Sequence, residues 1–343
     1  MGWFQRTGYD VYMQPRAPVM KPTLYRHPHG ITAVDAEYLY PGHAAAHIIC
    51  DGGRAAFVDV GTNSSVPYLL RALDELGIGR AAVDYLLLTH VHLDHAGGAG
   101  LLMRELPNAR ALLHPRGAPH MIDPAKLIAG SQAVYGEERF RRMYGALLPI
   151  APERVRAVAD GERIALGGRT LELMHTPGHA QHHYVVVDAA HASIFSGDTF
   201  GISYRALDTE KGAFITPSTV PTQFDPQQHI ASIDRMLSLR PESIYLMHFS
   251  RVRDIQRLGA SLKEQIEALA RMARAHAADA DPAGGIRADM LALWRTLARA
   301  HGCRLTDGEL AQVFDGDLTL NTQGLIAWLA RTGELGRGAR VRP

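Results

Sequence analysis

The sequence predicts an α/β fold, in which β-sheets are covered by helices, followed by a helical extension. Between about residues 30 and 250, short apolar runs alternate with segments of helical periodicity in two successive series. This alternation is typical of sheets with helices on their faces. Beyond residue 252 the chain becomes rich in Ala, Arg and Glu at helical spacing. We therefore expect a first domain over residues 1–252, with its core at about 30–250, and a helical extension over residues 253–343.

The first series begins with a buried strand and an amphipathic helix. The strand over Ala55–Val60 stops at Gly61, and the helix after it has Ser64 or Ser65 as its cap and Pro67 in its first turn. The later elements of this series are a strand over Val83–Leu88, a short helix over Gly98–Leu106 and a strand over Ala111–His114.

The second series of strands follows a mixed, partly helical segment over residues 116–150. The expected strands are Ile164–Leu166, Thr170–Met174, Tyr184–Val187, Ser193–Phe195 and Ser243–Met247. A Pro-rich loop over residues 217–226 precedes the last of them and leads into a helix that ends at Leu239.

The C-terminal part is expected to be helical. Residues 253–279 have helical spacing, and the DPAGG stretch at 281–285 is interpreted as a linker. Two further helices are expected over Ile286–His301 and Asn321–Thr332, and the tail after Gly333 is expected to be frayed.

The overall composition excludes several classes of protein. Lys plus Arg number 36 and Asp plus Glu number 35, a net charge of +1, which does not favour nucleic-acid binding through counterion release. The opening MGWFQRTGYDVYMQPR has no apolar run of signal-peptide length, and no window approaches a membrane span. The two cysteines, Cys50 and Cys303, are too few for a disulfide framework. We expect a soluble, cytoplasmic protein without nucleic-acid or membrane partners.

The residues that carry chemistry are histidines, of which the chain has 18. Residues 86–98 read LLLTHVHLDHAGG, so a strand delivers the chain to a turn that holds His90, His92, Asp94 and His95. Alternate residues of an extended strand end point to the same side. His90 and His92 can therefore hold one metal ion, while the turn re-aims Asp94 and His95. A histidine-rich surface loop is the alternative, but the density of ligand-type residues favours a metal site.

This stretch resembles the HxHxDH signature of the metallo-β-lactamase superfamily, and other landmarks of that family follow in order. FVDVGT (57–62) resembles the first motif, TPGH (176–179) the third, FSGDT (195–199) the fourth and YLMHF (245–249) the last. The likeness spans about residues 30–250 and leaves out the helical C-terminal part. It implies a four-layer αββα sandwich for the first domain.

The resemblance also implies a site for two metal ions. One ion would be held by His90, His92 and His179 and the other by Asp94, His95 and His248, with Asp198 shared between them. A plain turn around His179, a helix N-cap at Asp198 and a core histidine at His248 are the alternatives. Asp59 is expected outside the ligand shell, where it would hold a ligand or a water by hydrogen bonds, with a simple turn former as the alternative.

The mechanism implied by the resemblance uses a hydroxide shared by two divalent ions, which also polarise a carbonyl or phosphoryl oxygen. Zinc is the first expectation for both ions, with iron or manganese as alternatives. Asp94 is expected to accept or pass on a proton. Tyr204 is a second catalytic candidate, as a donor to an oxyanion, and core packing is its alternative role.

Other residues near the motifs are weaker candidates. One of His182 and His183 is expected to line the pocket or to support a ligand, and one of His43 and His47 is a candidate for lining it. His175 is expected to be structural. The Pro-rich loop either roofs the site or only connects two elements.

The ligand set resembles the glyoxalase II-like and lactonase-like members, which implies a hydrolase for a small ester, thioester or lactone. The true β-lactamases lack the shared aspartate, so antibiotic hydrolysis is not expected. The alternatives are a mononuclear iron enzyme like the persulfide dioxygenases, which the spacing from His179 to Asp198 does not exclude, and a phosphodiesterase. A flavin-coupled diiron oxygen reductase and a non-catalytic binding protein are disfavoured. We expect a small-molecule substrate and a homodimer formed through the helical extension.

Overall fold

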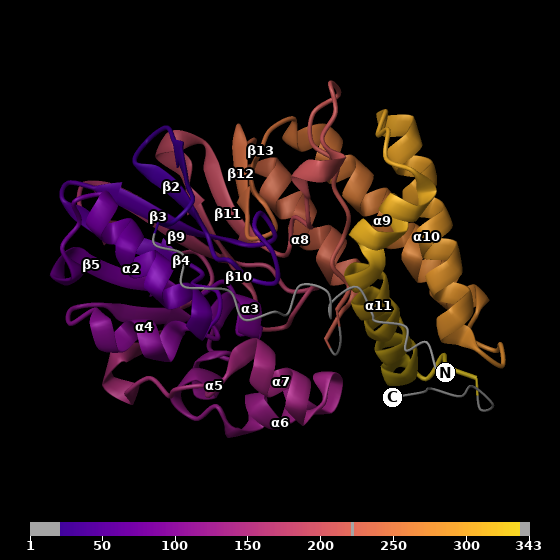
Figure 1. Cartoon of the computed structure of the whole chain (residues 1–343), viewed down its shortest axis with the longest axis horizontal. Helices are drawn as coiled ribbons and strands as arrows, with labels where there is room; N and C mark the ends of the chain where they lie inside the picture. Colours follow the sequence, from indigo (N-terminus) through magenta and orange to yellow (C-terminus); the bar gives the residue numbers. More distant parts are fainter. Residues whose placement is uncertain (1–20, 221–222, 337–343) are drawn as a thin grey trace.

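The structure is a computed structural model that describes residues 21–220 and 223–336. Two sheets pack face to face, and helices cover the outer face of each (Figure 1). The predicted four-layer αββα sandwich with a C-terminal helical extension is therefore confirmed. The opening of the chain, where we expect no signal peptide, and the last part of the tail predicted to fray lie outside the described residues.

The first sheet has seven strands in sequence order. Neighbouring strands from β1 to β4 are antiparallel, and those from β4 to β7 are parallel. The strands are β1 (Leu24–His27), β2 (Ile31–Asp35), β3 (Ala45–Asp51), β4 (Arg54–Val58), β5 (Val83–Leu87), β6 (Arg110–Leu113) and β7 (Val155–Ala157).

The second sheet has six strands in the order β13-β12-β11-β10-β9-β8. Its neighbours are antiparallel except for the parallel pair β11 and β12. The strands are β8 (Glu162–Leu166), β9 (Arg169–His175), β10 (Tyr184–Asp188), β11 (Ser193–Gly197), β12 (Ser243–Leu246) and β13 (Ser250–Val252).

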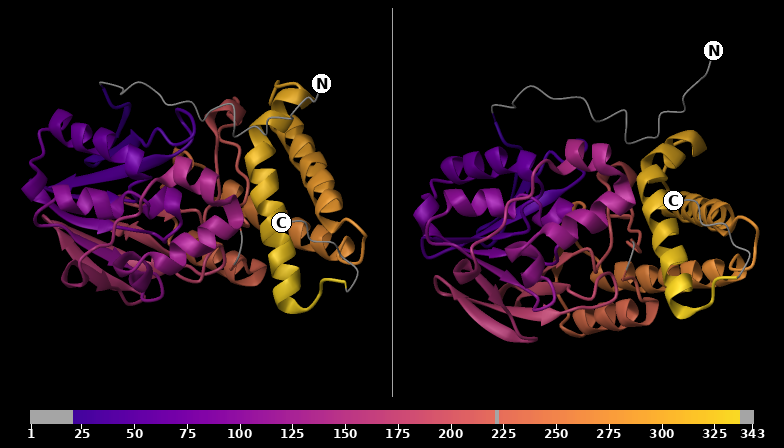
Figure 2. Two further views of the ribbon diagram at one scale, coloured as in Figure 1. Left: turned by 60° about the horizontal axis from the view of Figure 1, so that its bottom comes forward. Right: turned by 90° about the horizontal axis from the view of Figure 1, so that it is seen from below.

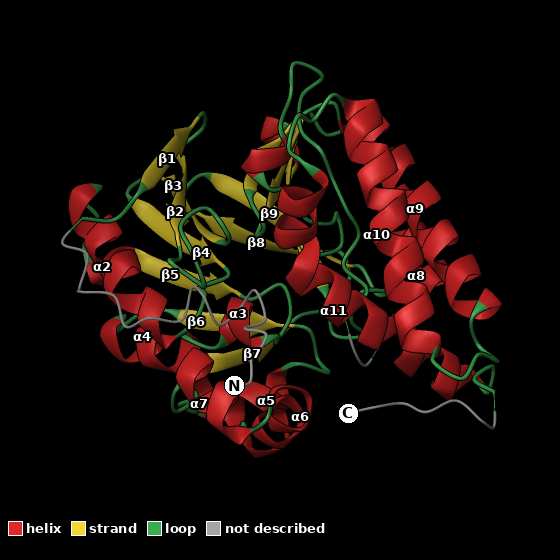
Figure 3. Ribbon diagram, turned by 45° about the vertical axis from the view of Figure 1, so that its right-hand side comes forward, coloured by secondary structure: helices red, strands yellow, loops and turns green. Residues whose placement is uncertain are grey.

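The helices divide between the two outer faces, as Figure 3 shows in red around the yellow sheets. On the side of the first sheet lie α2 (Val66–Glu75), α3 (Leu93–Ala96), α4 (Ala99–Glu105), α5 (Ala118–Ile122), α6 (Ala125–Tyr135) and α7 (Glu137–Tyr144). On the side of the second sheet lie α8 (Pro226–Ser238), α9 (Ile255–Ala275), α10 (Pro282–His301) and α11 (Asp307–Thr332). Short 3-10 turns occur at Asn63–Ser65, Arg80–Ala82, Pro152–Arg154, Ala189–His191 and Arg205–Leu207.

Apolar side chains fill the spaces between the layers. Val58 and Leu87 of the first sheet meet Leu173 and Phe195 of the second in a buried cluster between the sheets. A second cluster lies under α2 and α4, and a third joins the outer face of the second sheet to α8–α11. The third cluster runs without interruption into the extension, and it includes Trp294, which is fully buried.

The strand directions bring the predicted site residues to one edge of the sandwich. Asp59 follows β4 and His90 follows β5, which run parallel in the first sheet. In the second sheet Asp198 follows β11 and His248 follows β12, which are also parallel. His179 follows β9, which runs in the same direction as β11 because each is antiparallel to β10. Ligands in open α/β sheets commonly bind beyond such carboxyl ends.

The C-terminal part corrects two predictions. DPAGG is not a linker, because α10 begins at Pro282 and the Asp281 carboxylate accepts a hydrogen bond from the Gly284 backbone N–H as its cap. Likewise, α11 begins at Asp307, well before the predicted Asn321, after a capping box formed by Thr306 and Glu309. The division into domains at residue 252 stays a prediction. Within the described ranges, no helix combines the length and apolar character that crossing a bilayer requires.

Candidate metal centre

The first group of ligand-type side chains consists of three imidazoles. Nε2 of His90 lies 2.8 Å from Nδ1 of His92, and Nε2 of His179 lies 3.1 Å from that same Nδ1 atom. In a tetrahedral zinc site with Zn–N bonds of 2.0–2.1 Å, the ligand nitrogens are about 3.3 Å apart. The three nitrogens are therefore already close to the spacing that a shared ion needs.

The second group combines a carboxylate with two imidazoles. Asp94 Oδ2 lies 3.2 Å from Nε2 of His248 and 3.8 Å from Nε2 of His95. Asp94 and His95 belong to the short helix α3, whereas His248 lies just beyond β12 of the other sheet. Both sheets therefore contribute to this group.

Asp198 lies between the two groups. Its Oδ2 atom is 3.5 Å from Nε2 of His179. Its Oδ1 atom is 3.2 Å from Nε2 of His95 and 3.9 Å from Nε2 of His248. Each carboxylate oxygen therefore faces one group, and all seven residues predicted as ligands are brought together.

Asp59 and Thr89 hold two of these imidazoles from behind. His95 donates its Nδ1–H to Asp59 Oδ2 over 2.9 Å, and Thr89 donates to the same carboxylate through its backbone N–H and its hydroxyl. Because the Thr89 hydroxyl proton points to Asp59, its oxygen accepts from His90 Nδ1 over 3.1 Å. Asp59 has a φ of 53°, a left-handed conformation that Asp tolerates better than most residues. Asp59 therefore contacts His95, one of the predicted ligands, and its role outside the ligand shell stays a prediction.

Backbone carbonyls hold two further imidazoles in the same way. His179 donates its Nδ1–H to the Ser218 carbonyl over 3.1 Å, and His248 donates to the His43 carbonyl over 2.8 Å. Since a carbonyl can only accept, each ring must carry its proton on Nδ1, which leaves the Nε2 lone pair directed into the site. Such outer hydrogen bonds fix the tautomer of metal-binding histidines.

The electrostatics of the two groups differ. Burial holds the pKa of His90 and His92 well below the usual value of 6.5, and neighbouring imidazoles lower it further. Burial acts in the same direction on His95, but Asp198, Asp59 and Asp94 together raise the pKa of His95 well above 6.5. The three-imidazole group therefore offers neutral lone pairs near neutral pH, whereas the second group is rich in negative charge.

Buried polar atoms of this cluster lack partners of good geometry. Within the described part of the chain, His95 Nε2 and Asp198 Oδ1 are buried without a hydrogen-bond partner, and orphaned polar atoms of this kind are costly. Neutral imidazoles and carboxylates are ligands for zinc, iron and manganese. Both observations fit a divalent ion held by these residues.

Two glycines of the motifs are required by close packing. Gly197 has a φ of 48°, and a Cβ there would lie 2.5 Å from Thr89 Oγ1 and 2.7 Å from His183 Nε2. Gly178 has a φ of 131°, and its Cβ would lie 2.2 Å from backbone atoms of His229. The absence of side chains at these positions lets Asp198 and His179 approach the site.

The weaker candidates divide into lining, supporting and structural residues. His182 is buried and lines the cavity described below, and burial lowers its pKa to about 3. His183 accepts from the Asp198 backbone N–H over 3.3 Å, so it supports a ligand-bearing turn. His43 lines a smaller cavity at the site, but His47 packs edge-on against the stacked rings of Phe195 and Tyr245. His175 hydrogen-bonds to the Val158 carbonyl, as expected of a structural histidine.

Tyr204 lies at the site without pointing a free hydroxyl into it. Its ring stacks on His43, with centroids 5.5 Å apart, and its hydroxyl donates to Asp317 Oδ1 over 3.3 Å. It lines the smaller cavity of about 50 Å³ together with Asp94 and Asp198. Its proposed role as an oxyanion donor stays a prediction.

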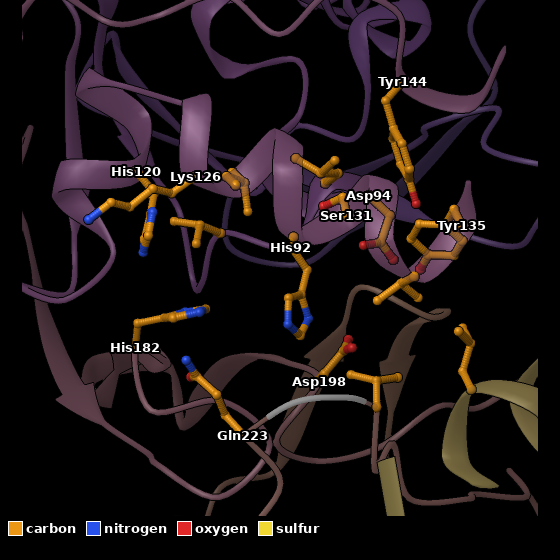
Figure 4. Close-up of a pocket in the computed structure, with 17 residues that line it drawn as sticks. His92, Asp94, His120, Lys126, Ser131, Tyr135, Tyr144, His182, Asp198 and Gln223 are labelled. Atoms are coloured by element: carbon orange, nitrogen blue, oxygen red, sulfur yellow. The ribbon is translucent and has the colours of Figure 1, made fainter. Parts of the chain in front are cut away.

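A cavity of about 240 Å³ opens onto the cluster, and Figure 4 shows the side chains around it. His92, Asp94 and Asp198 form its metal-facing wall, and Tyr135 and Tyr144 direct their hydroxyl groups toward that wall. The remaining polar lining comes from His120, Lys126, Ser131, His182 and Gln223. The 116–150 segment supplies much of this lining, although it carries no sequence motif that marks the lining residues.

The Pro-rich loop borders the site as well. Val220 and Gln223 line the cavity, and Ser218 holds His179. Leu320 of α11 lines the same cavity from the helical extension. No sequence motif marks these residues, and the fold brings them to the site from parts of the chain far from the His90–His95 turn.

Comparisons with known proteins decide the family. Residues 39–248 match the sequence profile of the Metallo-beta-lactamase superfamily. The chain belongs to the metallo-β-lactamase superfamily. It is 28% identical over 225 residues to the metallo-beta-lactamase fold-containing protein ST1585 of Sulfurisphaera tokodaii, covering 64% of this chain and 77% of that protein. It is 34% identical over 152 residues to a hydroxyacylglutathione hydrolase of Stenotrophomonas maltophilia, covering 44% of each chain.

A solved structure supports the fold over nearly the whole chain. The beta-lactamase domain protein from Burkholderia ambifaria has a TM-score of 0.62 at 19% identity and covers 91% of this chain and 90% of that one. The fold and the His/Asp groups of this superfamily member imply a divalent metal ion. The matched region spans less than half of the hydroxyacylglutathione hydrolase.

Proposed function

We propose that this protein is a dinuclear metal-dependent hydrolase that cleaves a small ester, thioester or lactone. The observation that carries the proposal is the position of Asp198, with one carboxylate oxygen facing His179 and the other facing His95 and His248. A carboxylate placed in this way is arranged to be shared by two ions. Divalent ions bound here would supply activated water near neutral pH and polarise a carbonyl oxygen.

The side chains of the protein supply positioning and proton transfer. Burial disfavours the charged form of Asp94, but the neighbouring His95 and His248 rings hold the Asp94 pKa well below its usual range. Asp94 is therefore ionised near neutral pH, and it lines both cavities at the site. In this proposal it accepts a proton from the attacking water and passes it to the leaving group.

The lining of the larger cavity supports a small substrate with an apolar end and a polar end. Leu127, Val134 and Leu320 provide apolar surface that suits an acyl group. Lys126 and Gln223 line the same cavity and suit a polar or anionic portion of the substrate. The similarity to a hydroxyacylglutathione hydrolase, whose name describes an acyl group carried on glutathione, supports the thioester member of this set.

The proposal is tested by metal analysis and a substrate panel on the same preparation. We expect two zinc-type ions per chain by plasma mass spectrometry, loss of hydrolysis on chelation and its return with added metal. The panel pairs thioesters, lactones and phosphodiesters at matched concentrations. A single iron per chain with oxygen uptake on a persulfide would refute the proposal in favour of the oxygenase, and hydrolysis of phosphodiesters alone would refute the acyl substrate.

A further inference from the structure

Helix α11 of the C-terminal extension lies directly behind the metal centre. Figure 2 shows this helix, in yellow, standing at one end of the sandwich in both views. Leu320 and Asn321 follow Asp317 by three and four positions, and Gly324 follows them by four and three, so the four residues share one face of the helix. Asp317 and Asn321 are buried, and Leu320 lines the cavity.

The first connection runs from Asn321 to the loop that holds His179. The Asn321 side-chain oxygen accepts hydrogen bonds from the backbone N–H and the hydroxyl of Thr219, and its amide donates to the Pro217 carbonyl. The single Thr219 hydroxyl proton is shared with the Asn321 backbone carbonyl, whose oxygen lies 3.1 Å from Oγ1. The carbonyl of Ser218, between these two anchored residues, accepts from His179 Nδ1.

Gly324 lets the loop approach the helix closely enough for these bonds. A Cβ at Gly324 would lie 1.5 Å from the Thr219 carbonyl oxygen. Since every other residue type carries a Cβ, the loop backbone can rest here only on glycine. Thr219 is fully buried, and Ser218 is nearly so. The position of the Ser218 carbonyl is thus set by α11.

The second connection runs from Asp317 to the residue that holds His248. Asp317 accepts the Tyr204 hydroxyl hydrogen bond, and the Tyr204 ring stacks on the His43 ring. The His43 backbone carbonyl accepts from His248 Nδ1 over 2.8 Å. One face of α11 thus reaches a histidine of each ligand group through intermediate residues.

We propose that α11 is a brace for the metal centre, in which Asn321 positions His179 and Asp317 positions His248. This inference rests on the proposed function, because it assumes that these histidines bind metal. Both residues are positioning residues, since neither touches the ion or the substrate. The helical extension then has a direct role in metal affinity.

The test compares a disrupting and a conservative variant at each position. Asn321→Ala removes both side-chain functions, whereas Asn321→Asp keeps the acceptor for Thr219. Asp317→Ala and Asp317→Asn form the second pair, and Gln323→Ala on the exposed side of α11 is the control. Zinc affinity is measured by competition with a chromophoric chelator, ligand geometry by the visible spectrum of the cobalt form, and folding by circular dichroism of the metal-free form.

We expect Asn321→Ala and Asp317→Ala each to weaken zinc binding about 10- to 100-fold, the range typical of residues that orient a metal ligand. The cobalt spectrum should change in both alanine variants, and the conservative variants should recover most of the affinity. Gln323→Ala should match the wild type. Folded alanine variants with wild-type zinc affinity and a wild-type cobalt spectrum would overturn the proposed positioning role of α11, even if they unfold at lower temperature. A wild-type protein that binds no zinc or cobalt would instead overturn the proposed function, and the brace with it.

Discussion

Removing the carboxylate of Asp198 is the sharpest test of the two-ion arrangement. Asp198→Ala takes away both oxygens, whereas Asp198→Asn keeps one and replaces the other with a nitrogen that cannot bind metal. Because Oδ2 faces His179 and Oδ1 faces His95 and His248, the alanine variant loses a ligand in both groups. The asparagine variant loses a ligand in only one of them.

The magnitude follows from comparison with outer residues. Side chains that only orient a metal ligand typically contribute 10- to 100-fold in affinity. A direct ligand should contribute at least the upper end, about 2.7 kcal/mol. We therefore expect the metal content to fall from two ions in the wild type to one in Asp198→Asn, and below one in Asp198→Ala, with hydrolysis lost from both.

Metal content by plasma mass spectrometry and turnover on the same samples measure this effect. Asp188→Asn is a matched control, because Asp188 is a buried carboxylate of the same sheet that pairs with Arg169 over 2.8 Å, away from the site. This control should lose stability and keep its metal. Full metal content together with normal turnover in Asp198→Ala would refute the shared-ligand role.

Three further predictions concern packing, pH and substrate charge. Gly197→Ala should lower the free energy of unfolding by at least about 1 kcal/mol, because a residue with a Cβ is strained at a φ of 48°. The same substitution should weaken zinc binding. Thermal unfolding measures the first effect and chelator competition the second, and a variant unchanged in both would contradict the packing argument. Burial lowers the pKa of His47 to about 3. As pH falls below 6.5, the His47 imidazole therefore becomes protonated in the unfolded chain before it does in the folded protein. The free energy of unfolding then decreases between about pH 6.5 and 3. In urea unfolding of the metal-free protein, the free energy of unfolding of His47→Leu should therefore fall by about 2 kcal/mol less than that of the wild type between pH 7 and 5. Equal decreases in the two proteins would contradict the lowered pKa of His47. Lys126→Met should raise KM about two- to five-fold for anionic substrates, whereas kcat and the KM for neutral substrates should stay unchanged. An equal rise in the KM for neutral esters would exclude a charge contact between Lys126 and the substrate.

The metal centre was more predictable from the sequence than its surroundings. His90, His92, Asp94 and His95 lie within six consecutive residues, so the spacing at a strand end already indicates convergence. His179 and the later ligands needed the order of family motifs, because no local pattern shows which strand ends meet.

The misread elements have a physical explanation. Pro and Gly in DPAGG are linker signals, but Asp281 followed by Pro282 is also a helix start, with a side-chain acceptor and a preset φ. In the structure, Asp281 and Pro282 start helix α10. The contact between Asn321 and Thr219 could not be predicted, because the helical pattern of α11 does not reveal which of its faces meets a loop about 100 residues earlier.

The hydroxyl of Thr89 offers a test of how the outer hydrogen bonds prepare the site. It donates to Asp59 and accepts from His90 Nδ1. Thr89→Val replaces it by a methyl group of nearly the same shape, so His90 keeps its packing and loses its acceptor. Asp59 loses one donor but keeps those from the Thr89 backbone N–H and His95. A buried imidazole N–H without a partner costs about 1–3 kcal/mol, and the ring is then free to turn its protonated nitrogen toward the site. We expect zinc affinity to fall about ten-fold in Thr89→Val and to be retained in Thr89→Ser, which keeps the hydroxyl. Equal affinities in the two variants would show that the site holds His90 without this hydrogen bond.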